Sequence, residues 1–377
     1  MITALNASPS RIPVLLGGCG TGRSTALYQL RDQLGRTTQY IDVDRAATTP
    51  ERFLHAVVTG SPFAAGETPA KGARPAFDAA LVFFSHARLA STEPATFLLD
   101  EFLELRTFES FPGLRRVIYD LLDELSISDN RFVLTSRYTA RTLRLLRDRS
   151  ARFEVVHIPL LTAEDIRELL GLPPNPIADG SAADASYTAR AVQALTDGRP
   201  VYVRAMAEQL DAMRAHGPGG GDVISAMAAL FALDGALTRQ IRFSYELRLH
   251  RARGYGALKA ILDILADQEG LTLTEISQRL QRTPGSTKDY LSWLEDVDLV
   301  SSRQKRYSYT DPLMRMWVRL HCRATAATDE DVAREVQLFA INRLPSQVET
   351  PAPAAGATAG TPGVEDDRKP WDIIELD

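Results

Sequence analysis

The N-terminal part of the chain alternates short apolar runs with segments whose apolar residues recur at helical spacing. The first run, Val14–Leu16, predicts a strand, and apolar residues at 27, 30 and 34 predict a helix that ends at Gly35. Four later runs predict further strands, and the segments 76–89, 114–125 and 163–170 predict helices. The later predicted strands are 38–41, 95–101, 132–137 and 153–158.

From residue 187 onward the pattern is mostly helical. A helix–helix–helix–hairpin order predicts a winged helix-turn-helix, with Thr274 as the cap of its second helix and basic residues in its hairpin turn. Asp311 and Pro312 then open a further helix. The predicted helices are 187–195, 201–214, 223–250 as more than one segment, 257–267, 274–280, 286–294, 312–321 and 329–341, with the hairpin at 300–309.

The segment between the first strand and the first helix matches a phosphate-binding loop. Gly17, Gly22, Arg23 and Ser24 have the required spacing, with arginine where lysine is usual. Glycines let backbone N–H groups curl around an anion, and the next helix directs its positive end to the same place. We expect Arg23 to reach the β- and γ-phosphates of ATP and Ser24 to ligate Mg²⁺. The residues predicted to hold the nucleotide are Gly17, Gly18, Cys19, Gly20, Thr21, Gly22, Arg23, Ser24 and Thr25.

Polar residues end two of the later strands. Asp100 is predicted to hold Mg²⁺, directly or through water, and Glu101 to orient or deprotonate the attacking water. Arg137 is a candidate sensor of the γ-phosphate, because ligands lie at the carboxyl ends of strands in open α/β sheets. The structural alternatives are a solvated strand end or helix N-cap for the two acids and an ordinary surface arginine for Arg137.

Composition and charge limit the class of protein. A chain of 377 residues suggests two or three domains. There is no apolar run of membrane-spanning length and no secretory signal, and Cys19 and Cys322 lie far apart. We therefore expect a cytoplasmic protein without membrane association.

Charge is spread unevenly along the chain. The chain has a net charge of −5, yet residues 236–323 carry fifteen Lys or Arg against ten Asp or Glu. This excess favours double-stranded DNA as a partner, contacted through Lys288, Arg303, Lys305 and Arg306. The third helix also carries acidic residues that DNA phosphates repel, which opposes its entry into the major groove; they are Asp289, Glu295 and Asp296. Docking of a protein is therefore the alternative.

Two further motifs are GRP at 198–200 and YTDPLMRMW at 309–317. Together with GGCGTGRST, FLLDE and LTSR they give residues 13 to about 323 a resemblance to the signal-transduction ATPases with numerous domains (STAND), a P-loop group near the AAA+ ATPases. The chain looks most like the archaeal-type branch with a C-terminal winged helix. The resemblance implies a parallel sheet of strand order 5-1-4-3-2, a helical lid, and a nucleotide between them with Pro200 nearby.

The expected organisation has four segments. They are a P-loop ATPase core at 1–160, a helical lid at 161–235, a winged helix-turn-helix with flanking helices at 236–344, and a disordered linker with a docking peptide at 345–377. The peptide, residues 369–377, sets Trp and Ile among acids and is a candidate site for a protein partner.

The leading functional hypothesis is an ATP-hydrolysing regulatory switch whose nucleotide state controls the winged-helix module. The alternatives are a DNA-binding regulator with a structural, non-hydrolysing nucleotide site, and a scaffold that recruits a partner through its tail. Arg23 departs from the family's lysine and should preserve binding better than turnover. Arg141 and Arg144 are candidates, by position only, for an arginine given to a neighbouring subunit of an oligomer.

Overall fold

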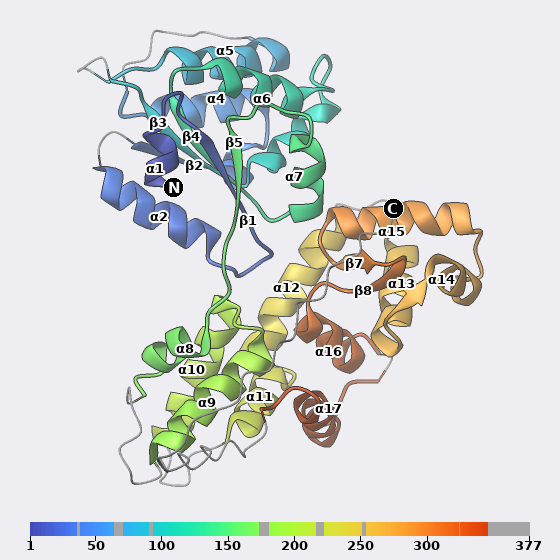
Figure 1. Cartoon of the computed structure of the whole chain (residues 1–377). Helices are drawn as coiled ribbons and strands as arrows, with labels where there is room; N and C mark the ends of the chain where they lie inside the picture. Colours follow the sequence, from blue (N-terminus) through green and yellow to red (C-terminus); the bar gives the residue numbers. More distant parts are fainter. Residues whose placement is uncertain are drawn as a thin grey trace, which may run out of the picture. The chain divides into compact units, whose positions relative to one another are not determined.

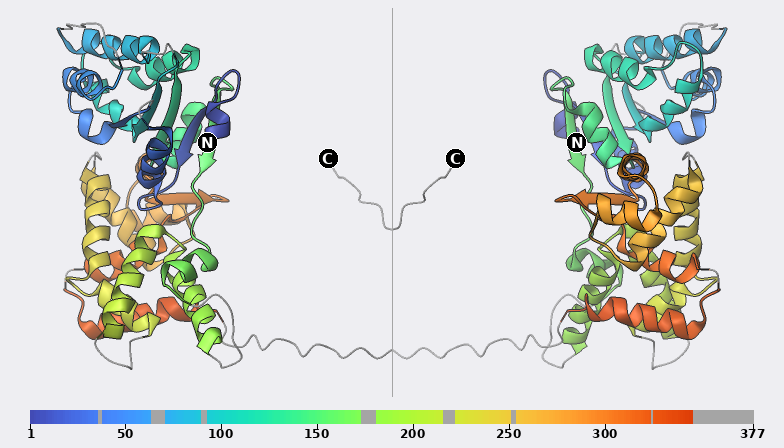
Figure 2. Two further views of the ribbon diagram at one scale, coloured as in Figure 1. Left: turned by 90° about the vertical axis from the view of Figure 1, so that its left-hand side faces the viewer. Right: turned by 90° about the vertical axis from the view of Figure 1, so that its right-hand side faces the viewer.

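The computed structural model describes residues 1–345 except 36–37, 64–70, 90–92, 173–180, 216–221, 251–253 and 324. Residues 1–345 form one compact unit, drawn in Figures 1 and 2. The linker and docking peptide predicted beyond Pro345 lie outside the described residues. No helix within the described ranges has the length and apolarity needed to cross a lipid bilayer.

A five-stranded parallel sheet organises the N-terminal part of the unit (Figure 1). The strand order is β2-β3-β4-β1-β5, which confirms the order implied by the resemblance. The loop ends of β1, β3 and β4 therefore lie side by side at the carboxyl edge. The strands are β1 (Ile12–Leu16), β2 (Thr38–Asp42), β3 (Thr96–Asp100), β4 (Arg131–Ser136) and β5 (Phe153–His157).

Helices cover both faces of this sheet because alternate strand residues point to opposite faces. Leu15, Leu98 and Val133 pack against α2 (Arg23–Leu34) and α1 (Ile2–Leu5) on one face. Their strand neighbours pack on the other face in an aromatic core that includes Phe97, 5.1 Å from Phe84 between ring centroids. The helices of that part of the chain are α3 (Val43–Ala46), α4 (Pro50–Thr59), α5 (Ala73–His86), η2 (Phe102–Ser110), α6 (Val117–Ile127) and α7 (Thr139–Leu146).

A helical segment follows β5. Its helices are α8 (Ala163–Leu169), α9 (Ser181–Thr196), α10 (Pro200–Ala215), α11 (Val223–Phe231) and α12 (Ala236–His250). The Pro, Gly and Ala of residues 173–183 predict a linker or exposed loop, but the chain is helical from Ser181; residues 173–180 lie outside the described ranges. The division of 223–250 into two helices confirms the prediction for that stretch.

The C-terminal module contains helices and a small antiparallel sheet of order β6-β8-β7. Its elements are α13 (Tyr255–Asp267), β6 (Leu271–Thr272), α14 (Leu273–Leu280), α15 (Pro284–Asp296), β7 (Val300–Arg303), β8 (Arg306–Tyr309), α16 (Pro312–His321) and α17 (Asp329–Ile341). Thr272, not Thr274, caps α14, because Thr272 and Glu275 exchange the two bonds of a capping box. One hydrophobic core runs from α8 to α17, with Tyr245 of α12 against Trp317 of α16 at 5.2 Å.

Candidate functional site

The glycine-rich segment forms a closed turn between β1 and α2. Gly20 and Gly22 have φ values of +77° and +91°, which a residue with a Cβ adopts only at a cost. Thr21 is buried, and its hydroxyl donates to the Gly18 carbonyl oxygen at 3.0 Å. The segment is thus a tight turn that holds two glycines in the left-handed region and is closed by the Thr21 hydroxyl.

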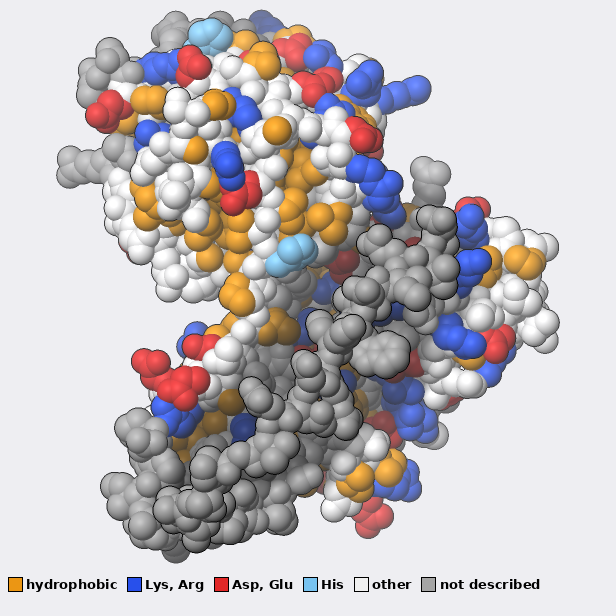
Figure 3. Space-filling model, in the orientation of Figure 1, with side chains coloured by type: hydrophobic (Ala, Val, Ile, Leu, Met, Phe, Trp, Pro, Cys, Tyr) orange, Lys and Arg blue, Asp and Glu red, His pale blue; other side chains and the backbone are white. Residues whose placement is uncertain are grey.

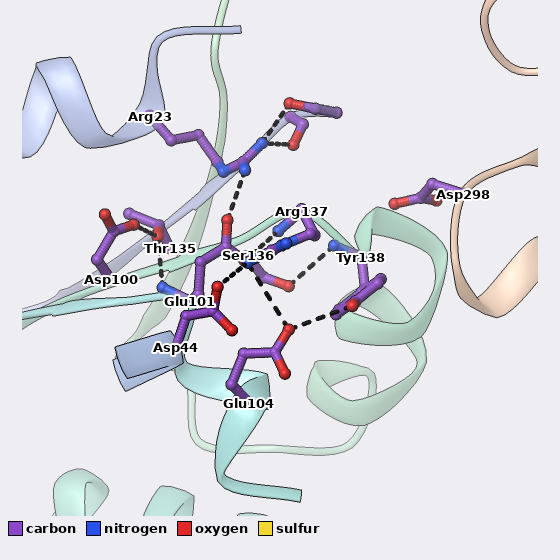
Figure 4. Close-up of polar contacts among 12 residues, drawn as sticks. Arg23, Asp44, Asp100, Glu101, Glu104, Thr135, Ser136, Arg137, Tyr138 and Asp298 are labelled. Atoms are coloured by element: carbon purple, nitrogen blue, oxygen red, sulfur yellow. Dashed lines mark hydrogen bonds and ion pairs between the residues drawn. The ribbon is translucent and has the colours of Figure 1, made fainter. Parts of the chain in front are cut away.

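The Arg23 side chain folds back into this loop. It is the first residue of α2, and only 7% of it is exposed. Its Nη1 donates to the carbonyl oxygens of Gly17 and Gly18, while its Nη2 lies 2.5 Å from Oε1 of Glu101 (Figure 4). Arg23 therefore joins the loop on β1 to the acid that follows β3.

Asp100 and Glu101 are both buried at the end of β3. The Asp100 carboxylate accepts from the hydroxyls of Thr135 at 2.5 Å and Tyr40 at 2.8 Å. Burial, together with a bond to Tyr28 and the Asp100 carboxylate, raises the pKa of Tyr40 well above its usual value, so Tyr40 remains a donor. Glu101 has a φ of +58°, and its N–H donates to Thr135 at 2.9 Å. Thr135 of β4 thus fixes both acids.

Arg137 lies on the far side of Glu101 from Arg23. Its backbone N–H donates to Oε2 of Glu101 at 3.0 Å, and its Nε forms an ion pair with the same oxygen at 3.1 Å. It also pairs with Asp44 at 3.2 Å. Burial opposes its charge, but the Glu101 carboxylate and further neighbouring groups, including Asp44, together outweigh burial and keep the Arg137 pKa above its ordinary value. Glu101 is therefore held by one arginine on each oxygen.

The predicted metal-binding residues offer only oxygen. Ser24 is half-buried in the first turn of α2 and Thr25 is exposed. Hydroxyl and carboxylate oxygens suit a hard cation such as Mg²⁺, so Ser24 and Asp100 fit the ion as donor types. Within the described ranges no cluster of three or more His, Cys, Asp or Glu residues could hold a metal without further ligands. A nucleotide-dependent ion is compatible with this donor set.

The helical segment contacts the phosphate loop through the start of α10. The Val201 N–H donates to the Gly20 carbonyl oxygen at 3.2 Å, next to Pro200. Arg199 lies beside Gly18, where a Cβ built on the glycine would be 3.5 Å from Nη1. The start of α10 therefore contacts the loop directly, and the predicted proximity of Pro200 to a nucleotide stays a prediction.

The GRP and YTDPLMRMW motifs contact each other through their polar residues. Arg199 pairs with Asp311 at 3.2 Å and donates to the Thr310 carbonyl oxygen at 2.9 Å. The Tyr202 hydroxyl donates to Asp311 at 2.6 Å. The sequence showed each motif but not this contact, because 112 residues separate Arg199 from Asp311. The link joins the loop region to the cap of α16.

Sequence reasoning also missed Arg248 on α12. It lies on the same face as the buried Leu237, Ile241 and Tyr245, at spacings of three and four residues. Its positive charge acts on Cys19 in the loop. Burial raises the pKa of Cys19, but the positive charges of Arg248, Arg137 and Arg23 together outweigh burial, so the pKa is lowered. An arginine on an apolar helical face was the available signal.

The sheet order, the loop and the acidic end of β3 together define a fold known from nucleotide hydrolases. The chain shares its fold with a Walker-type ATPase. That protein, from Pyrococcus abyssi, has a TM-score of 0.58 and 16% sequence identity, over 84% of this chain and 93% of that one.

Two weaker structural similarities have TM-scores of 0.42 and 0.41. The first is the Orc1 protein of Aeropyrum pernix in complex with DNA, at 16% identity over 84% of this chain and 88% of that one. The second is the RuvB Holliday junction branch migration motor of Thermotoga maritima, at 13% identity over 83% and 90%. No protein-family model and no curated protein matches the sequence.

Proposed function

We propose that the protein is an Mg²⁺-dependent ATPase that acts as a regulatory switch. The observation that carries this proposal is the position of Glu101, next to the phosphate loop and held by Arg23 and Arg137. A carboxylate there orients or deprotonates the water that attacks the γ-phosphate. Mg²⁺, bound by Ser24 and Asp100, would neutralise charge that develops on the phosphates. The C-terminal module is the output element, because Asp311 links it to Arg199 beside the loop.

Steady-state ATP turnover with Mg²⁺ tests this function. We expect turnover in the parent, and we expect Glu101→Gln to abolish it while ATP binding is retained. Glu109→Gln is the matched control, since Glu109 is an acid of η2 that pairs with Arg106 rather than with the site. Binding without turnover in the parent would instead support a structural nucleotide, and no binding at all would refute the proposal.

A second candidate function is binding of double-stranded DNA by the C-terminal module, read as a winged helix. The supporting observation is that Lys288, Arg303, Lys305 and Arg306 are all exposed. The turn residues Gln304 and Lys305 both have positive φ values, as a tight two-residue turn between β7 and β8 requires. Acidic side chains lie among the basic ones on the face in Figure 3, so any DNA contact must be local.

Salt-dependent duplex binding tests this second candidate. Replacing Arg303 and Lys305 by alanine should weaken duplex binding and reduce its salt dependence. Each phosphate contact that is lost lowers the number of counterions released on binding. A duplex affinity that is unchanged in the double variant would exclude the hairpin as a DNA-contacting element. Recruitment of a protein partner through residues 369–377 remains a proposal for a segment outside the described residues.

A further inference from the structure

Two hydroxyl groups hold the Asp100 carboxylate, one from each neighbouring strand of the sheet. Thr135 of β4 donates to its Oδ1 at 2.5 Å (Figure 4), and Tyr40 of β2 donates to its Oδ2 at 2.8 Å. Asp100 and Thr135 are both buried, so water does not compete freely for these bonds. Each carboxylate oxygen therefore has a donor of its own, and turning the carboxylate would break both bonds.

Strand register places Tyr40 on the face of the sheet that carries Asp100. Tyr40 pairs with Leu98 across β2 and β3, and Leu98 lies two residues before Asp100, on the same face. That face packs against α2, where the Tyr40 ring lies 4.7 Å from the ring of Tyr28 between centroids. A phenylalanine at position 40 would keep this packing and lose the bond to Asp100.

The two hydroxyls differ in what else they hold. The Thr135 hydroxyl oxygen also accepts the Glu101 N–H at 2.9 Å, so Thr135 positions both acids at the end of β3. Of these two acids, Tyr40 is bonded to Asp100 alone in the described part of the chain. The effect of removing one donor from Asp100 can therefore be measured at Tyr40 without disturbing the candidate base.

The two bonds affect which metal ion Asp100 can hold. Ca²⁺ takes more oxygen ligands than Mg²⁺ and often binds a carboxylate through both oxygens. Mg²⁺ is smaller, demands near-ideal octahedral geometry and keeps several of its waters. Chelation through both oxygens of Asp100 needs both to turn toward one ion, and the hydroxyls of the two flanking strands oppose that turn. The site therefore offers one carboxylate oxygen, or a water held by it, more readily than two.

We propose that Tyr40 is a specificity-determining residue that makes the nucleotide site select Mg²⁺ over Ca²⁺, by keeping Asp100 from turning both carboxylate oxygens to one ion. This inference rests on the proposed nucleotide binding, which supplies the phosphates that share the ion. Tyr40 acts through Asp100 and is a positioning residue. Removing its hydroxyl frees one oxygen of Asp100, so the loss should favour Ca²⁺ rather than weaken the site in general.

The test compares affinities for one nucleotide with two metals. Calorimetry on the full chain measures binding of the β,γ-imido analogue of ATP, which is not hydrolysed, with Mg²⁺, with Ca²⁺ and with EDTA in place of either metal. The parent should bind the Mg²⁺ complex more tightly than the Ca²⁺ complex. Tyr40→Phe should bind the Ca²⁺ complex about tenfold more tightly than the parent does, because binding no longer costs one hydrogen bond to a charged group. Its affinities for the Mg²⁺ complex and for the metal-free analogue should stay close to those of the parent.

Tyr119→Phe is the matched control. Tyr119 is an exposed tyrosine of α6 whose ring lies 4.8 Å from the guanidinium of Arg149, and it has no part in the site. This variant loses a tyrosine hydroxyl elsewhere on the chain, so it should match the parent in all three titrations.

The outcomes separate this inference from the proposed function. A gain confined to the Ca²⁺ complex supports the role of Tyr40, because a loss of structure would weaken binding of both complexes. Any other pattern, or a parent that binds both complexes equally, would overturn the role while leaving nucleotide binding established. A parent that binds no nucleotide would overturn both. If thermal unfolding shows that Tyr40→Phe does not fold, Tyr40→Leu, which also lacks the hydroxyl, takes its place with the same expected result.

Discussion

The contact between the phosphate loop and α10 depends on a glycine, which makes Gly20→Ala a sharp test of the structure. A Cβ built on Gly20 would lie 2.2 Å from Cγ1 of Val201. The Gly20 carbonyl oxygen also accepts the Val201 N–H at 3.2 Å. Alanine must therefore adopt a left-handed conformation and also push Val201 away from the loop.

Gly22→Ala supplies the matched control for magnitude. Gly22 also has a positive φ, but a Cβ there would meet nothing within 4 Å. The left-handed conformation costs alanine about 1–2 kcal/mol at either position. Overpacking adds about 1–3 kcal/mol at Gly20 alone. We therefore expect the free energy of unfolding to fall by about 1–2 kcal/mol in Gly22→Ala and by about 2–5 kcal/mol in Gly20→Ala.

Chemical denaturation of the nucleotide-free chain measures both losses. Adding Val201→Ala to Gly20→Ala removes the branched side chain and should recover most of the extra loss, measured against Val201→Ala alone as a double-mutant cycle. Hydrogen exchange in the first turn of α10 should rise in Gly20→Ala and not in Gly22→Ala. Equal losses in the two single variants, or no recovery in the double variant, would refute the reasoning.

Two further predictions concern buried charges. The lysine of Arg23→Lys cannot contact the loop carbonyls and Glu101 at once, so the free energy of unfolding of the nucleotide-free protein should fall by about 1–3 kcal/mol. The ATP affinity, measured by calorimetry, should rise, and an unchanged affinity would contradict this prediction. Burial raises the pKa of Asp298 from 3.8 to about 6. Between these pH values the folded protein binds more protons than the unfolded chain does, so its free energy of unfolding falls as the pH rises. Asp298→Asn should remove this fall of about 3 kcal/mol in the free energy of unfolding. If the unfolding free energies of the variant and the parent run parallel with pH, the fall does not come from Asp298.

The sheet and its loop were predictable because they depend on local pattern. Apolar runs separated by helical periodicity mark strands that are buried on both faces, and the glycines of the loop mark positive φ. The strand order followed from the resemblance carried by the motifs. The short helices α3 and α4 were not predicted. Nor was η2, which begins directly after the left-handed Glu101.

The contacts within the site could not be predicted, because they join residues that are distant in sequence. Spacing placed Arg23 in the loop, but its partner Glu101 is 78 residues away. The Thr139–Asp298 bond spans 159 residues. Such pairs depend on how the segments pack, and a single sequence carries no signal for that packing beyond the face on which a residue lies. The position of Arg248 on the apolar face of α12 is such a signal, because it indicates a buried arginine without identifying its partners.

The arginine at position 23 changes what the loop does before a nucleotide binds. A lysine ammonium is a single point of charge, whereas a guanidinium is a planar fork whose nitrogens donate in different directions. Arg23 uses one nitrogen for the loop carbonyls and the other for Glu101. Because Arg137 holds the second oxygen of Glu101, this carboxylate is engaged on both sides. A triphosphate must draw Arg23 toward itself before Glu101 can act on water, so we expect phosphate binding and release of the base to occur together.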